Sequence, residues 1–231
     1  MKLLAIETAT EACSVALWID GDLRERYEVA PRRHAELVLP WADALLAEAG
    51  IAKSQLDAIA VGRGPGAFTG VRLAIALAQG MALALDRPVI PVSTLAALAM
   101  HGEGQRIVAA IDARMSEIYV GTFARAADGL VTAIDTERLA RPDAIVLPEG
   151  RDWIGIGSGF AADDGALVKT LGDRLLRHDA TALPHAADVV RLAARAYANG
   201  EAVAPELAEP AYLRDKVALT LAEQSEMRSN R

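Results

Sequence analysis

Short runs of apolar residues alternate along this chain with longer stretches in which apolar residues recur every three or four positions. The short runs, bounded by turn residues, predict buried strands, and the longer stretches predict helices with an apolar face. The expected strands are residues 2–6, 14–19, 23–29, 56–61, 87–92, 107–114, 117–123 and 153–156. The expected helices are residues 33–49, 71–85, 93–100 and 186–199. This alternation of strands and helices predicts an α/β protein.

The helix expected at residues 33–49 has one apolar face, formed by Leu37, Val38, Trp41, Leu45 and Leu46. Proline is tolerated only near the first turn of a helix, so Pro40 predicts that the regular helix begins close to Ala35. His34 stands at its entrance. A capping or surface role is more typical there than metal binding, because no other His or Cys partners it at helical spacing.

A glycine-rich stretch joins the strand at 56–61 to the most apolar helix of the chain. It reads Gly62-Arg63-Gly64-Pro65-Gly66-Ala67-Phe68-Thr69-Gly70-Val71-Arg72. A strand, a glycine loop and a helix start in succession are one arrangement that binds anions. The stretch fits neither phosphate motif, because no lysine follows Gly70 and Thr69 stands where a dinucleotide loop has its third glycine. The local pattern favours a structural turn, with the anion site as the alternative.

The second half of the chain repeats the beginning of the first. The strands at 2–6 and 14–19 flank the turn Glu7-Thr8-Ala9-Thr10-Glu11, which either faces a phosphate or metal or is a simple hairpin turn. Residues 107–123 repeat the order of strand, acidic turn and strand, and the glycines in 101–105 predict a domain boundary. We therefore expect two related domains, 1–104 and 105–231, with a cleft between their equivalent turns and a short frayed tail.

Composition narrows the classes of function. The 231 residues are 52% hydrophobic and carry a net charge of −7, which argues against a broad nucleic-acid surface on this chain alone. Cys13 is the only cysteine, so an internal disulfide and a cysteine-based zinc site are excluded. The apolar stretch 73–85 is shorter than the roughly 20 residues of a membrane span, and Glu7 stands where a signal peptide stays apolar. We expect a cytoplasmic protein without a membrane segment.

Several motifs together resemble those of the TsaB family, the non-catalytic paralogues of TsaD in bacterial synthesis of threonylcarbamoyladenosine in tRNA. The resemblance covers most of the chain and rests on Ala5-Ile6-Glu7-Thr8-Ala9-Thr10, Arg33-His34-Ala35-Glu36-Leu37, the stretch 64–72, Asp112-Ala113-Arg114-Met115 with Glu117-Ile118-Tyr119, and Pro210-Ala211-Tyr212-Leu213-Arg214. It implies an actin/sugar-kinase (ribonuclease H-like) fold of two related mixed-sheet domains with helices on their faces. That fold agrees with the internal repeat.

The chain departs from TsaD at the metal site. The catalytic relative carries two histidines, H-x-x-x-H, where this chain has Thr94 and Leu98, and neither side chain is a good ligand for iron or zinc. The resemblance therefore implies no metal, no cofactor of its own and no catalytic residue. Actin-like kinases place Asp and Gly at the first strand turn, where this chain has Glu7 and Ala9, and the methyl group of Ala9 would crowd a phosphate.

If the reactive centre is lost, the remaining surface should bind protein. The resemblance implies a helical bundle with a TsaD-like catalytic subunit, or with a second copy of the chain when that partner is absent. A TsaE-like ATPase joins the assembly, and tRNA is reached only through the complex. The expected interface residues are Leu37, Val38, Trp41, Leu45, Val71, Ala74, Ile75 and Ala78. The alternative is that both faces of these helices are intramolecular core.

A rival interpretation is an ATP-dependent phosphotransferase or ATPase of the actin/sugar-kinase type. In that case Glu7, Thr8, Asp112 and Gly157 line the interdomain cleft, and residual ATP or ADP binds there, shared with partner subunits. A glycoprotease finds no support, because neither a metal-ligand pair nor a Ser/His/acid set can be placed.

Overall fold

The structure, a computed structural model, describes residues 1–214, so the predicted frayed tail lies outside the described residues. The strands are β1 (Lys2–Glu7), β2 (Ala12–Ile19), β3 (Asp22–Val29), β4 (Ala58–Gly62), β5 (Val89–Val92), β6 (Arg106–Arg114), β7 (Glu117–Arg125), β8 (Val131–Ala133), β9 (Arg138–Ala140), β10 (Trp153–Ile156) and β11 (Leu175–Asp179). The α-helices are α1 (His34–Glu48), α2 (Phe68–Leu85), α3 (Thr94–Ala99), α4 (Ala162–Leu171) and α5 (Ala186–Ala198). All the strands and helices expected from the sequence are present.

The strands form two mixed sheets of matching topology. The first has the order β3-β2-β1-β4-β5, and the second has the order β11-β10-β6-β7-β8, with β9 also paired to β7. In each sheet an antiparallel hairpin, β1–β2 or β6–β7, is extended on its other side by parallel strands. The predicted internal repeat and the predicted actin/sugar-kinase class of fold are both confirmed.

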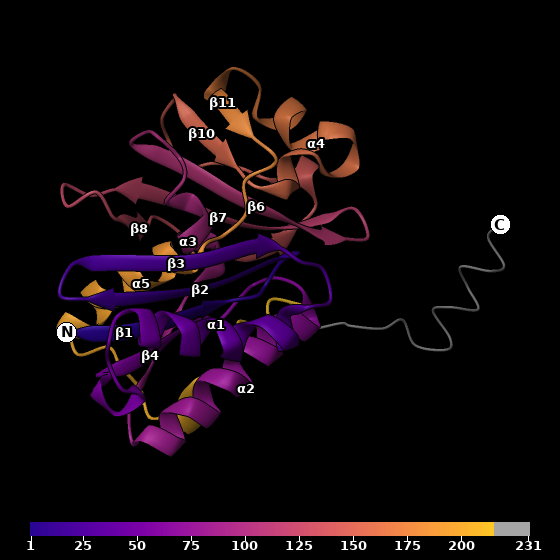
Figure 1. Cartoon of the computed structure of the whole chain (residues 1–231). Coiled ribbons are helices and arrows are strands. Elements are labelled where there is room, and N and C mark those ends of the chain that lie inside the picture. The colour runs from indigo at the N-terminus through magenta and orange to yellow at the C-terminus, as the bar shows by residue number, and fades with distance from the viewer. Residues whose placement is uncertain (215–231) are drawn as a thin grey trace, which may run out of the picture.

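Helices separate and cover the two sheets. Figure 1 shows α1 and α2 on the outer face of the first sheet, and α3 and α5 between the two sheets. The central strand β1 explains this layering, because its successive side chains point to opposite faces and those from Leu3 to Ile6 are all apolar. Leu4 and Ile6 pack with α1 and α2, whereas Leu3 and Ala5 pack with α3, α5 and the second sheet.

The face of α2 that touches the first sheet is the stripe expected to bind a partner. Val71 and Ile75 are each 5% exposed, and Ala74 and Ala78 are fully buried within the cluster that includes β1 and β4. Because these side chains are already covered by their own domain, their assignment to a partner interface is wrong. The sequence periodicity could not show which face of α2 packs on the sheet, because the outer face of the helix is apolar as well.

The same correction applies to part of α1. Val38 and Leu45 are buried in the domain core, and Leu37 and Trp41 are only partly buried against it. The helix begins at His34, one residue earlier than expected, and Pro40 lies within its second turn. A partner could therefore contact α1 only through residues other than Val38 and Leu45.

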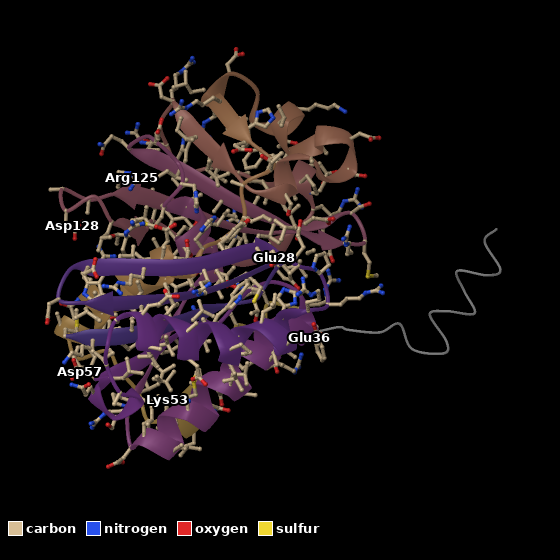
Figure 2. All side chains as sticks on the ribbon, viewed as in Figure 1. Glu28, Glu36, Lys53, Asp57, Arg125 and Asp128 are labelled. Carbon is tan, nitrogen blue, oxygen red and sulfur yellow. The ribbon has the colours of Figure 1, made fainter. Side chains whose placement is uncertain are left out.

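The chain after Asp179 returns to the first sheet. α5 packs on the inner face of that sheet, and Val203 forms an antiparallel bridge with Val89 of β5. The division expected at residue 104 thus separates the two sheets, but the last helix belongs with the first of them. Arg125 at the end of β7, labelled in Figure 2, holds the linker between the halves by donating to the carbonyl oxygens of Met100 at 3.1 Å and Gly102 at 2.6 Å.

By length and composition alone, α2 could cross a membrane, with 18 residues and a mean hydropathy of 1.6. The expectation that no stretch reaches that length is therefore wrong for this helix. A single helix of this kind is weak support for a membrane span, because core helices pass the same test. One face of α2 is such a core face.

Candidate functional site

The glycine loop packs against the turn that follows β1. A Cβ atom on Gly66 would lie 2.4 Å from the carbonyl oxygen of Ala9, and one on Gly70 would lie 2.0 Å from that of Thr8. The amide of Ala67 donates to the Ala9 carbonyl at 2.7 Å, and Thr8 Oγ1 donates to the Gly70 carbonyl at 2.8 Å. The two glycines thus make room for the chain's own backbone, as the structural-turn interpretation predicts.

Glu7 lies beneath this turn and is completely buried. Its Oε1 accepts a hydrogen bond from the amide of Ala9 at 2.6 Å, and its Oε2 accepts one from Thr94 Oγ1 at 2.8 Å. Gly62 provides the space, because a Cβ atom there would lie 1.9 Å from Glu7 Oε2. The carboxyl group therefore joins the end of β1 to the start of α3 and the end of β4.

Burial raises the pKa of Glu7 from 4.5 to about 7, against the opposing effect of the hydrogen bonds from Ala9, Thr94 and Thr8. A carboxyl group without a positive partner in an apolar interior favours its neutral form. Glu7 is thus a structural carboxyl group that changes protonation state near neutral pH.

Thr94 and Leu98, which the resemblance places where TsaD has its two histidines, are both buried. Thr94 Oγ1 accepts from the amide of Gly64 at 3.2 Å while it donates to Glu7. Leu98 is fully buried, and its Cδ2 would lie 2.5 Å from a Cβ atom on Gly157. Within residues 1–214, no group of three or more His, Cys, Asp or Glu side chains is arranged to hold a metal ion.

A cleft of about 980 Å³ opens between the equivalent turns of the two halves. Its walls are the β1–β2 turn, the start of α2 and the β6–β7 turn. Of the four residues expected there, only Asp112 lines it, and both carboxylate oxygens of Asp112 accept from Arg114 at 2.8 Å. The expectation is wrong for Glu7, Thr8 and Gly157, which are buried behind the wall.

Residues 210–214, the crossing segment, bridge the two halves beside this cleft. The amide of Ala211 donates to the carbonyl of Arg63 at 2.8 Å, and Arg214 pairs with Glu117 at 2.7 Å. The ring of Tyr212 lies 4.8 Å from the guanidinium carbon of Arg72, which also lies 3.2 Å from the ring of Phe68. The motif singled out in this segment therefore fixes one half of the molecule to the other.

A second cavity, of about 940 Å³, lies on the other side of the crossing segment. Its polar groups include Arg63, Ser93 and Glu137, and Ser93 Oγ donates to Glu137 Oε1. The sequence analysis did not identify these residues as a site. No local pattern could have found it, because Ser93 and Glu137 are 44 positions apart and come from different sheets.

Three smaller features lie near these sites, and the first agrees with the capping role expected for His34. His34 Nε2 lies 3.1 Å from the carbonyl oxygen of Thr10, and its ring caps the β1–β2 turn. Cys13 is buried, and burial raises the pKa of its thiol to about 12. The glycines near β10 are packed closely, since a Cβ atom on Gly159 would lie 2.6 Å from Ala110 Cβ on β6.

The two related sheets and the cleft between their turns define a protein of the actin/sugar-kinase class. The family model of TsaD, described as tRNA N6-adenosine threonylcarbamoyltransferase, matches residues 27–221. YeaZ from Pseudomonas aeruginosa is 46% identical, and the match covers 92% of this chain and 99% of that one with a TM-score of 0.85.

Several curated relatives carry the name TsaB. The tRNA threonylcarbamoyladenosine biosynthesis protein TsaB of Escherichia coli K12 is 41% identical over 167 residues, which are 69% of this chain and 72% of that protein. TsaB of Haemophilus influenzae is 47% identical over 129 residues, 54% of this chain and 55% of that protein. The chain therefore belongs to the TsaB family.

The contact between the glycine loop and the β1–β2 turn predicts opposite effects for two glycine substitutions in α2. Gly70→Ala should lower the free energy of unfolding by about 1–3 kcal/mol, because its Cβ would collide with the Thr8 carbonyl. Gly80→Ala, which meets nothing within 4 Å, should raise it by about 0.5–1 kcal/mol. Urea unfolding of both variants measures the difference, and equal effects would contradict the packing described.

The raised pKa of Glu7 predicts a dependence of stability on pH. The folded protein binds this proton more tightly than the unfolded chain, so stability contributed by Glu7 falls as pH rises from 4.5 to about 7 and is constant above. The whole change is about 3 kcal/mol. Urea unfolding at several pH values should show this slope for the protein and a much shallower one for Glu7→Gln. The exposed control Glu149→Gln should keep the full slope, and an unchanged slope in Glu7→Gln would refute the assignment.

Proposed function

We propose that this protein is a cytoplasmic, non-catalytic scaffold in tRNA threonylcarbamoyladenosine biosynthesis, and that it pairs with a TsaD-like catalytic subunit through the outer faces of α1 and α2. Its place in this biosynthesis rests on membership of the TsaB family. The observation that best supports the proposed pairing is the apolar outer face of α2.

The outer face of α2 lacks the polar residues that a solvent-facing helix normally has. Leu83 is 64% exposed and Phe68 is 58% exposed, and Ala76, Gly80 and Ala84 between and beside them are exposed as well. Arg72 is the only charged residue among the 18 of the helix. A face of this kind is typical of a surface that is covered in an assembly.

The spacing of small residues suits helix packing. Ala76, Gly80 and Ala84 follow one another every four residues on the exposed side of α2, and small side chains at this spacing let a second helix approach closely. On α1, Leu39 is 43% exposed and Trp41 is only partly buried, so both could contact the same partner. Burial of roughly 800 Å² on each partner would make a standard interface.

The charges of α1 favour a protein partner over a membrane. Its exposed residues include Glu36, Asp43 and Glu48, and Figure 2 labels Glu36 near the N-terminal end of the helix. Anionic headgroups repel acidic side chains. A homodimer through the same faces would form where the catalytic subunit is absent, and a TsaE-like ATPase and tRNA would join through the complex.

The arrangement of the cleft supports a non-catalytic role. The positions of the TsaD histidines are buried, and the carboxyl group of Glu7 is used within the core. We propose no cofactor for the chain itself, and residual ATP or ADP would be held only together with a partner subunit.

The proposed interface predicts that Leu83→Glu and Ala76→Glu weaken pairing with the TsaD-like subunit of the same organism by roughly 2 kcal/mol or more, because each buries a charge at the centre of the contact. Co-purification and titration calorimetry measure this loss. Both side chains are exposed in the isolated chain, so circular dichroism should show an unchanged fold.

Leu176→Glu is the matched control, since Leu176 on β11 is also 64% exposed but lies in the second sheet. It should pair as the unchanged protein does. If Leu83→Glu and Ala76→Glu both pair with full affinity, α2 does not form the interface.

The lack of an independent nucleotide site predicts that titration of the isolated chain with ATP and Mg²⁺ gives neither micromolar binding nor release of phosphate. The wall of the cleft offers two carboxylates, Glu11 and Asp112, and Asp112 already binds Arg114. Binding with turnover would favour the rival ATP-dependent enzyme, and its loss in Asp112→Asn but not in Asp135→Asn would place that activity in the cleft.

A further inference from the structure

The second cavity brings two opposite charges from different halves of the molecule together. Arg63 belongs to the glycine loop, and Glu137 follows β8 in the second sheet. The Nη2 atom of Arg63 lies 3.9 Å from Glu137 Oε2, farther than the roughly 2.7–2.9 Å of a direct charge-assisted hydrogen bond. The two groups are neighbours, but each keeps room for another partner.

The hydrogen bonds of the pair are incomplete. Ser93 Oγ donates to Oε1 of Glu137, whereas no residue in the range 1–214 donates to its Oε2. The side chain of Arg63 likewise has no acceptor within hydrogen-bond distance among these residues. A guanidinium group carries five N–H donors, so this one can bind a carboxylate through two parallel hydrogen bonds.

Because Glu137 is largely buried, leaving its Oε2 atom without a hydrogen-bond donor is energetically unfavourable. Its side chain is 12% exposed, against 38% for Arg63. Burial raises the pKa of Glu137 above its ordinary 4.5, and the hydrogen bond from Ser93 and the charge of Arg63 only partly oppose this. A cation placed beside Oε2 would stabilise the ionised carboxylate.

The floor of the cavity is apolar. Val92, Phe123 and Leu192 form it, each less than 8% exposed, and Ala196 of α5 adjoins them. Cavities of a few hundred to about 1,000 Å³ that combine an apolar lining with a few fixed polar groups are typical ligand sites. The occupant should have an apolar body beside its charged end.

We propose that this cavity binds the head group of an α-amino acid, with the ammonium group on Glu137 and the carboxylate on Arg63. An α-amino acid carries both charges on one carbon atom, which matches the adjacent Arg63 and Glu137. Its side chain, or a larger group attached to it, lies over the apolar floor. The proposal is independent of the proposed assembly through α1 and α2.

A polyanion such as a nucleotide fits this cavity poorly. Asp135, Glu137 and Glu201 all line it, and Arg195, the other cationic group, already pairs with Asp128 at 3.5 Å and donates to the carbonyl of Val131. Phosphate groups would meet more negative than positive charge there. The mixed charge favours a zwitterion.

The test is a titration of the full chain with L-threonine and L-leucine as probes, followed by calorimetry and saturation-transfer NMR. Binding should require both charges, so N-acetyl-L-threonine, without the ammonium group, and L-threonine amide, without the carboxylate, should each bind at least about tenfold more weakly. Glu137→Gln and Arg63→Gln should each weaken L-threonine binding to a similar extent. Glu149→Gln, an exposed acid outside the cavity, should bind like the unchanged protein.

Comparison of ligand analogues on the unchanged chain keeps the test valid even if one variant fails to fold. Absence of binding by both amino acids at millimolar concentration would overturn the proposal. So would binding of the acetylated and amide analogues that is as tight as that of L-threonine, or full affinity in both variants. In any of these cases Arg63, Ser93 and Glu137 are only a structural bridge between the halves.

Discussion

The contact between residues 7–9 and the glycine loop is the constraint on which the rest of the structure depends. Glu7, Thr8 and Ala9 occupy the space that Gly62, Gly70 and Gly66 leave open, and an added methyl group at any of the three glycines would collide with them. Close packing of this kind leaves no room for relaxation. It fixes the end of β1, the start of α2 and, through Thr94, the start of α3 as one unit. In a related fold that binds phosphate the same elements would face a ligand; here they face each other.

This closure explains how a duplicated fold can be retained for a different purpose. The matching strand orders of the two sheets preserve the framework of an actin/sugar-kinase fold. The cleft between the turns remains, but the crossing segment at residues 210–214 ties its two walls together. The surfaces that we propose for binding other molecules are the outer face of α2, together with α1, and the cavity beside Arg63 and Glu137. The first suits a helical partner and the second suits a small zwitterion.

The sequence predicted the elements well because their patterns are local. Strands such as β1 and β4 are continuous apolar runs, and the repeat of strand, acidic turn and strand in both halves is visible without coordinates. The orientation of α2 could not be predicted, since a helix with Val71 and Ala78 on one side and Leu83 and Ala76 on the other is apolar in both directions. The sequence analysis placed Glu7 at the turn or in the cleft and not in the core, because acidic side chains are usually exposed. The return of α5 to the first sheet and the approach of Glu137 to Ser93 are tertiary contacts that no local pattern encodes.

The central claim is that the turn after β1 fills the glycine loop permanently in the isolated chain. Native-state hydrogen exchange at the amide of Ala67, which donates to the Ala9 carbonyl, tests it most directly. The account predicts that this amide exchanges only through global unfolding, with a free energy of opening equal to the global stability. Exchange through a low-energy local opening would show instead that the loop can release the turn, and that the phosphate position is accessible after all.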